Sequence, residues 1–199
     1  MTEITSNKSK AGSCEIHFLS TGSPDNPTVV LLHGMKFQAA TWQELGTLKR
    51  IAEEGFHVIA MEMPGFGLSP TCSVEQNKVL ETFLQEIGQQ KIILIGPSMG
   101  GRIALEFTIN HPERISALIL VGAVGVEENR NNLSLIDVPT LMIWGSEDQI
   151  SPLTNCEILL SSISGSKKII IEGAPHPCYL DNPETWHTEL MNFLNSLTH

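Results

Sequence analysis

One segment of the chain indicates its architecture more directly than any other: Ile92-Ile93-Leu94-Ile95-Gly96-Pro97-Ser98-Met99-Gly100. It opens with four consecutive apolar residues, which is typical of a strand buried on both faces. A Gly-Pro turn follows, and residues 99–110 then show the spacing of a helix. The order of strand, turn and helix places Ser98 in the turn, where the glycines at 96 and 100 leave room for a sharp change of direction.

The rest of the chain repeats this alternation. Short runs rich in Val, Ile and Leu predict further strands at residues 28–32, 57–61, 117–121, 140–144 and 168–171, with an antiparallel edge strand at 16–19. Helical spacing marks residues 42–54, 74–87, 99–110, 153–163 and 183–197. Strands that alternate with helices predict an α/β fold, in which a mostly parallel sheet carries helices on both faces.

The chain has 199 residues, the length of one ordinary domain. We find no repeat or linker that would divide it, so we predict a single domain over residues 13–199. Residues 1–12 are polar and lack the apolar core of a signal peptide. We expect them to form a flexible N-terminal segment.

Charge and hydropathy exclude several classes of protein. The formal net charge is −10 and no Lys- or Arg-rich run is present. Nucleic acids and anionic membranes are bound through clustered positive charge, so we expect neither as a partner. No apolar stretch approaches the roughly 18 residues of a membrane span. We therefore expect a soluble, cytoplasmic protein.

The cysteines indicate neither cross-links nor a metal site. Cys14, Cys72, Cys156 and Cys178 show no C-x-x-C spacing and no paired Cys/His cluster, so we expect no disulfide framework and no bound metal. Four reduced thiols are consistent with a cytoplasmic location. Cys178, close to His176, could be a reactive thiol, but we expect it to be a packing residue.

Residues 96–100 match the pattern G-x-S-x-G of a nucleophile elbow, in which a strained turn exposes a serine hydroxyl. A serine is a weak nucleophile unless a histidine accepts its proton and an acid orients that histidine. In folds with this elbow the acid and then the histidine follow the serine along the chain. Asp148 and His176 meet this requirement, since each follows a predicted strand, and Glu147 is the competing acid.

The oxyanion formed by attack on a carbonyl needs hydrogen-bond donors that are already in place. We expect one to be the backbone N–H of Met99, directly after the nucleophile. The other should come from the loop after His33-Gly34, from Met35 or from Lys36, with His33 shaping the loop. The side chains of Met35 and Met99 could also line an acyl pocket, although methionine is more often a core residue.

Several motifs, spread over residues 16–194, resemble the lid-less α/β-hydrolase-domain-containing protein 14 family. The resemblance implies the α/β-hydrolase fold, a triad of Ser98, Asp148 and His176, and esterase-type activity on short acyl groups. It also implies removal of acyl groups from protein lysines with transfer to coenzyme A, and a protein partner, a transcription-initiation factor. The motifs are His33-Gly34-Met35-Lys36-Phe37, Thr41-Trp42, Leu45-Gly46-Thr47, Met63-Pro64-Gly65-Phe66-Gly67-Leu68-Ser69 and His176-Pro177-Cys178-Tyr179-Leu180-Asp181, followed by Pro183 and Trp186-His187.

Two functions remain as hypotheses from the sequence. The first is a serine hydrolase or acyltransferase that acts on a small acyl ester or acyl-amine and needs no resident cofactor. Because residues 122–138 leave room only for a loop and not for a helical lid, we expect an open site that prefers short acyl groups, from acetyl through butyryl, over long-chain ones. The second is a non-catalytic module that keeps the fold but senses a ligand or binds a protein, because fold alone does not fix function.

Overall fold

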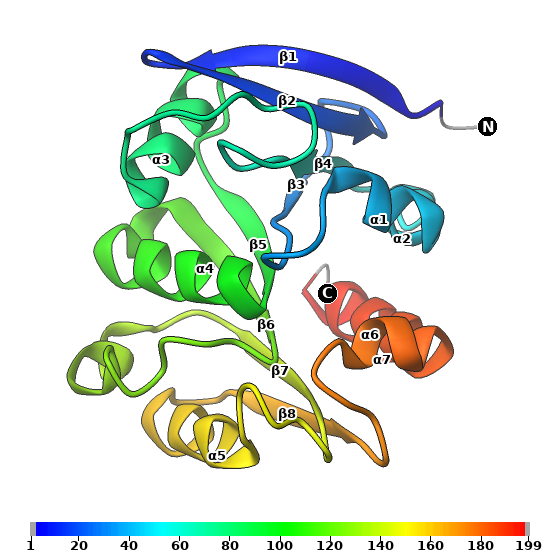
Figure 1. The fold of residues 1–199 in the computed structure, drawn as a ribbon. Helices are drawn as coiled ribbons and strands as arrows, with labels where there is room; N and C mark the ends of the chain where they lie inside the picture. Colours follow the sequence, from blue (N-terminus) through cyan, green and yellow to red (C-terminus); the bar gives the residue numbers. More distant parts are fainter. Residues whose placement is uncertain (1–2, 198–199) are drawn as a thin grey trace.

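The structure, a computed structural model that describes residues 3–197, is built around one eight-stranded sheet (Figure 1). The strand order is β1-β2-β4-β3-β5-β6-β7-β8. Strands β3 to β8 are parallel, whereas β2 pairs antiparallel with β4 and β1 antiparallel with β2. The predicted α/β-hydrolase fold with a mostly parallel sheet is confirmed. The strands are Thr5–Ala11 (β1), Cys14–Thr21 (β2), Thr28–Leu31 (β3), His57–Met61 (β4), Ile92–Pro97 (β5), Ile115–Val121 (β6), Thr140–Gly145 (β7) and Lys167–Ile171 (β8).

Helices cover both faces of this sheet. Figure 1 shows α3, α4 and α5 on one side and α1, α2, α6 and α7 on the other. Their bounds are Ala39–Glu44 (α1), Thr47–Glu53 (α2), Gln76–Glu86 (α3), Ser98–Asn110 (α4), Leu153–Ser162 (α5), Cys178–Asp181 (α6) and Pro183–Ser196 (α7).

The buried residues form two hydrophobic clusters, one on each face of the sheet. Strand β5 contributes Ile92 and Leu94 to one cluster and Ile93 and Ile95 to the other. Successive side chains of a strand point to opposite faces, so a strand covered on both sides must be apolar at every position. This explains the unbroken apolar runs in the sequence.

Three expected elements differ in the structure. The predicted helix at 42–54 is two helices, α1 and α2, because Gly46 adopts a φ of 80° between them. The strand expected at the sheet edge, β2, is an inner strand that pairs on both sides. The edge is β1, so the prediction of a flexible segment is wrong for residues 5–11 and stays untested for residues 1–2, which lie outside the described part. A polar strand was missed because an edge strand needs no apolar face.

The prediction of four reduced thiols is also wrong. Cys14, at the start of β2, forms a disulfide with Cys72, in the loop before α3, and their Cα atoms are 5.7 Å apart. The two residues are 58 positions apart in the sequence, so no local spacing pattern marks the pair. Cys156 and Cys178 are free and buried. Reduced thiols therefore no longer support a cytoplasmic location.

The connection between β6 and β7 is a loop, as the sequence predicts. Within it lies one short 3-10 helix, Arg130–Leu135, and no helical lid is present in residues 122–139. Among residues 3–197, no helix is both long enough and apolar enough to cross a membrane.

Candidate active site

Ser98 lies at the turn between β5 and α4 in a conformation that few side chains adopt. Its φ is 51°, and among the described residues it is the one non-glycine residue with a positive φ. Such a conformation costs about 1–3 kcal/mol and persists only where the surroundings enforce it. A Cβ at Gly96 would collide with the carbonyl oxygen of Gly100, and a Cβ at Gly100 would lie 2.7 Å from the carbonyl oxygen of His33. The predicted glycine-dependent strained turn is present.

The loops after β7 and β8 bring two further side chains to Ser98. The Nε2 atom of His176 lies 2.8 Å from Ser98 Oγ. The Nδ1 atom of His176 lies 2.9 Å from Oδ1 and 2.8 Å from Oδ2 of Asp148. Because a carboxylate only accepts hydrogen bonds, the proton belongs on Nδ1, which leaves Nε2 free to accept from the serine hydroxyl.

Asp148 is held firmly in this arrangement. Its side chain is fully buried, and its Oδ1 atom accepts the backbone N–H groups of Ile150 at 2.9 Å and Ser151 at 2.8 Å. These bonds compensate for the burial of a charged group. Glu147, the competing acid, is exposed, and the Nδ1 atom of His176 is bonded to Asp148 instead. The structure therefore brings together Ser98, Asp148 and His176 as the sequence predicts.

Two backbone segments that carry the predicted oxyanion donors border the serine. Met99 lies in the first turn of α4, where amide groups have no partner within the helix, and the positive end of the helix dipole faces the same point. Gly34 lies against Ser98, since a Cβ on it would be 3.7 Å from Ser98 Cβ. The amide of Phe37 already donates to Gly34 O at 3.0 Å, which leaves the choice between Met35 and Lys36 as a prediction.

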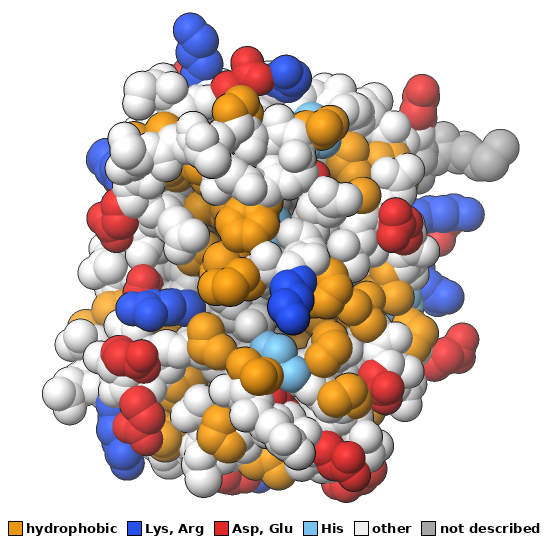
Figure 2. Space-filling view, viewed as in Figure 1, with side chains coloured by type: hydrophobic (Ala, Val, Ile, Leu, Met, Phe, Trp, Pro, Cys, Tyr) orange, Lys and Arg blue, Asp and Glu red, His pale blue; other side chains and the backbone are white. Residues whose placement is uncertain are grey.

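An open apolar cavity of about 500 Å³ lies over the serine. Figure 2 shows hydrophobic side chains gathered near the centre of the face in view, together with a histidine and a basic side chain. Met35 and Ile150, at the cavity, are about two-thirds exposed, so the rim of the cavity is apolar but accessible to solvent. A cavity of this size can hold a small acyl group and part of a leaving group. Its lining comprises Gly34, Met35, Lys36, Phe37, Pro97, Ser98, Met99, Val121, Val124, Ile150, His176, Pro177 and Tyr179.

Buried aromatic rings support the wall that carries His176. The ring of Tyr179 lies 5.0 Å from that of Trp42 and 6.0 Å from that of Trp186, and both tryptophans are buried. Cys178 is fully buried, and burial raises the pKa of its thiol to about 12. A thiol with such a pKa is not a nucleophile near neutral pH, in agreement with the predicted packing role.

Sequence reasoning missed several residues of this region, among them Tyr179, Ile150 and Glu62. Ile150 lines the cavity, but nothing in its local pattern distinguishes it from a surface residue. Tyr179 also lines the cavity, and it lies in the family-like motif that begins at His176, but the motif alone assigned it no role in the site. Glu62 lies buried below the loop at 33–39. It directly follows β4, as Asp148 follows β7, and an acidic residue at the carboxyl end of a parallel strand is a signal that could have marked it.

Comparison with known proteins identifies the family to which the fold belongs. Residues 27–137 match the family model of the alpha/beta hydrolase fold. The chain belongs to the α/β-hydrolase fold family. A "putative protein-lysine deacylase ABHD14B" of Rattus norvegicus is 32% identical over 178 residues, which span 85% of this chain and 84% of that protein. The "Protein ABHD14A" of Danio rerio is 33% identical over 85% of this chain and 64% of its own length.

These relatives confirm the resemblance to the domain-containing protein 14 family and support a hydrolase. Among solved structures, a "predicted CIB-like hydrolase" from Thermoplasma acidophilum superimposes with a TM-score of 0.95. It covers 98% of this chain and 100% of its own length at 24% identity, which shows a shared fold. The α/β-hydrolase fold thus places the Ser98 elbow in its usual structural setting.

Proposed function

We propose that this α/β-hydrolase is a serine hydrolase that removes short acyl groups from esters or amines through an acyl-serine intermediate on Ser98. The observation that carries the proposal is the continuous chain of contacts from Ser98 Oγ to His176 Nε2 and from His176 Nδ1 to Asp148. A buried acid, an oriented imidazole and a serine in a strained turn are the parts that such chemistry needs.

In the first half of the reaction, Ser98 Oγ attacks the carbonyl carbon of the acyl group while His176 Nε2 takes the hydroxyl proton. Asp148 stabilises the imidazolium that forms. The carbonyl oxygen becomes an oxyanion, for which we assign the N–H groups of Met99 and Met35 as donors. His176 then gives its proton to the leaving oxygen or nitrogen, and the acyl-serine remains.

In the second half, an acceptor replaces the leaving group. His176 takes a proton from water, or from another acceptor, and the resulting nucleophile attacks the acyl-serine. Collapse of the second tetrahedral intermediate returns the proton to Ser98 Oγ and releases the acyl product. The open mouth of the cavity admits water directly, so hydrolysis needs no further component.

The cavity favours short acyl groups. Its wall is apolar close to Ser98, but Met35 and Ile150 at the rim are largely exposed. Each methylene that becomes buried contributes about 0.8 kcal/mol, and a tail that extends beyond the rim contributes little. We expect kcat/KM for 4-nitrophenyl esters to rise from acetyl to butyryl and not to rise further at octanoyl.

The name of the rat relative suggests a second substrate class, acyl groups on protein lysines. We extend this class to the present chain and include coenzyme A as a candidate acyl acceptor, since a thiol held at the acyl-enzyme competes with water by proximity. An acetyl-lysine peptide with coenzyme A should yield deacetylated peptide and acetyl-coenzyme A, both detectable by mass spectrometry.

The test is a panel of acetyl, butyryl and octanoyl esters and an acetyl-lysine peptide, each with and without coenzyme A. Ser98→Ala is the matched control. Ester turnover that requires Ser98 supports the proposal. Formation of acyl-coenzyme A distinguishes acyl transfer from hydrolysis. No turnover of any substrate by the folded wild-type protein would contradict the proposal and favour a ligand-sensing or protein-binding module.

A further inference from the structure

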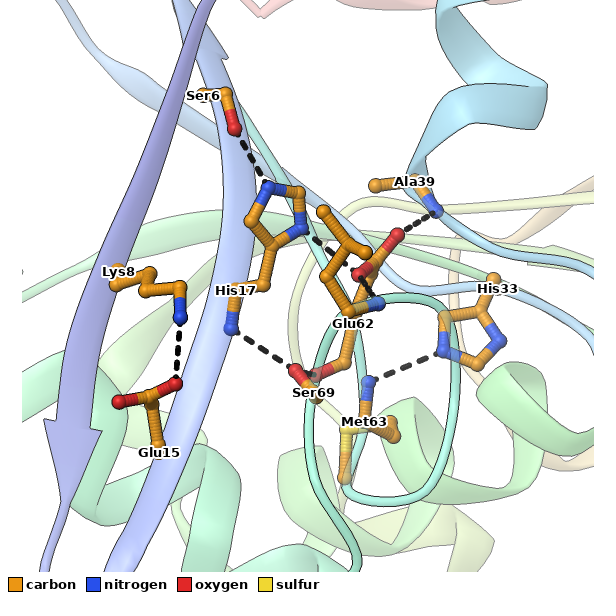
Figure 3. A network of polar contacts seen from close by, with 10 residues as sticks. Ser6, Lys8, Glu15, His17, His33, Ala39, Glu62, Met63 and Ser69 are labelled. Carbon is orange, nitrogen blue, oxygen red and sulfur yellow. Dashed lines mark hydrogen bonds and ion pairs between the residues drawn. The ribbon is translucent and has the colours of Figure 1, made fainter.

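A buried carboxylate lies beneath the loop that borders Ser98. Glu62, directly after β4, is only 2% exposed. Its Oε1 atom accepts the N–H of Ala39 at 3.3 Å, and its Oε2 atom accepts the N–H of Leu68 at 2.7 Å. Oε2 also lies 2.8 Å from Nδ1 of His17 on β2 (Figure 3). Three donors from three segments converge on one side chain, which is the condition under which a charge can be buried.

The residue next to Glu62 holds the other end of the same loop. The N–H of Met63 donates to His33 Nε2 at 3.1 Å, so the ring proton is on Nδ1, which donates to Gly34 O at 2.9 Å. Burial lowers the pKa of His33, which keeps the ring in this neutral form. Residues 62 and 63 therefore anchor the loop at His33, where it begins, and at Ala39, where it ends.

Met35 and Lys36, the candidates for the second oxyanion donor, lie between these two anchors. An oxyanion hole works only if its donors are already aimed when the charge develops. A loop of this length that was held at one end alone could turn its amide groups away from Ser98. The bond from Glu62 to Ala39 closes the loop at its far end.

The surroundings of Glu62 fit closely around the carboxylate. Gly67 has a φ of 52°, and a Cβ there would overlap the Glu62 carboxyl group, so the loop at 65–69 wraps directly against it. Ser69 Oγ donates to Glu62 O at 2.8 Å and accepts the backbone N–H of His17 at 2.9 Å. The position of Glu62 is therefore constrained by contacts with β2, with the start of α1 and with the loop at 65–69, as a positioning residue requires.

We propose that Glu62 is a positioning residue for the oxyanion hole, and that His17 holds Glu62 in place. The proposal rests on the serine-hydrolase function proposed above. Ser6 Oγ lies 2.7 Å from His17 Nε2, so Ser6, His17 and Glu62 repeat the contact order of a triad. Ser6, however, is on the extended edge strand β1, without a strand-to-helix turn or helix N-terminus beside it. We therefore assign His17 to holding the carboxylate and not to activating Ser6.

The first test asks whether Glu62 holds the loop at Ala39, and it does not rely on enzyme activity. Glu62→Gln keeps the size of the side chain but replaces one accepting oxygen with a donating amide. Amide hydrogen exchange, followed by NMR, should become at least about tenfold faster at Ala39 and Phe37, whose N–H groups bond to Glu62 and to Gly34. Unchanged exchange at both residues in a folded variant would overturn the anchor.

The second test compares an ester with the matching thionoester, in which sulfur replaces the carbonyl oxygen. Sulfur is larger than oxygen and a weaker hydrogen-bond acceptor. The ratio of kcat for the ester to kcat for the thionoester therefore reports on the oxyanion hole, whereas general damage to the fold lowers both rates. We expect Glu62→Gln to lower kcat for the oxygen ester by about 10- to 100-fold and the ratio by about tenfold, with KM changed by less than about threefold. A wild-type ratio, or a loss that appears only in KM, would overturn the positioning role.

Matched variants keep the test decisive if Glu62→Gln folds poorly. His17→Asn retains a donor near the position of Nδ1 and should preserve the ratio, whereas His17→Leu removes the donor and should lower it. Glu106→Gln changes a carboxylate on α4 that bonds to Arg102 and Asn77, and it should leave the ratio unchanged. Equal ratios in His17→Asn and His17→Leu would overturn the role of His17. Inactivity of the wild-type protein on every ester would contradict the proposed function, and amide exchange would still test the anchor.

Discussion

Loss of the Cys14–Cys72 disulfide should reduce the stability of the fold by an amount that follows from the length of the loop it closes. The bond joins β2 to the loop before α3 across 58 positions of the chain. In the chain-entropy description, a cross-link of this span removes about 14 cal/mol/K from the unfolded state, or about 4 kcal/mol at 25 °C. For a domain of this size, that corresponds to a decrease in Tm of about 8–16 °C.

The assay is urea unfolding of the wild-type protein and of the Cys14→Ala/Cys72→Ala variant, each with and without dithiothreitol. Reduction should lower the free energy of unfolding of the wild-type protein by up to about 4 kcal/mol and leave the variant unaffected. Because reduction breaks the disulfide without removing any side chain, its effect on the wild-type protein separates the contribution of the cross-link from that of the packing lost in the variant. Cys156→Ala, which removes a buried free thiol, should retain the full sensitivity to reductant.

A thiol count gives the clearest refutation. After denaturation without reductant, the wild-type protein should expose two reactive thiols, from Cys156 and Cys178, and four after reduction. Four thiols before reduction, or a stability that does not change when four thiols have been freed, would refute the reasoning.

Three further outcomes are expected. Ser98→Ala should lower kcat by about 10⁶ and Asp148→Asn by about 10⁴, with Tm by circular dichroism nearly unchanged, and equal losses would contradict the assigned roles. Burial, and then the charge of Arg50, lower the pKa of His187 from 6.5 to about 4. Folding therefore favours neutral His187, so its contribution to stability is complete above pH 6.5 and is lost as the pH falls toward 4. His187→Gln should weaken this pH dependence in urea unfolding, and an unchanged dependence would contradict the reasoning. Lys36 is exposed at the mouth of the cavity, so its charge should favour substrates with anionic leaving groups. Lys36→Glu should lower kcat/KM for a carboxylate-bearing ester about fivefold relative to a neutral ester. Equal changes in kcat/KM for the two esters would exclude this role.

The parts of the fold that the sequence predicts are those with a local signal. Strands buried on both faces are apolar at every position, so β3 to β7 are visible as runs, and the elbow at Ser98 is visible as a pattern in the right context. Asp148 and His176 could be selected because both follow strands of one parallel sheet, whose carboxyl ends meet at a single edge.

The features that escaped prediction depend on contacts between distant segments. Strand β1 is polar, and it is a strand because β2 offers it a free edge. The Cys14–Cys72 pair joins residues with no local pattern in common. Glu62 acquires its partners from β2, from the start of α1 and from the loop at 65–69. Such contacts are set by tertiary packing, and one sequence contains no periodicity that reports them.

The most direct test of the central assignment, Ser98 as nucleophile, is covalent labelling with a fluorophosphonate. The wild-type protein should gain the mass of one phosphonyl group, with the label on the peptide that contains Ser98, since the reagent needs both an activated serine and oxyanion donors. Ser98→Ala should gain none, and Ser6→Ala should label like the wild-type protein. A folded wild-type protein that remains unlabelled, or a label that persists in Ser98→Ala, would contradict the assignment.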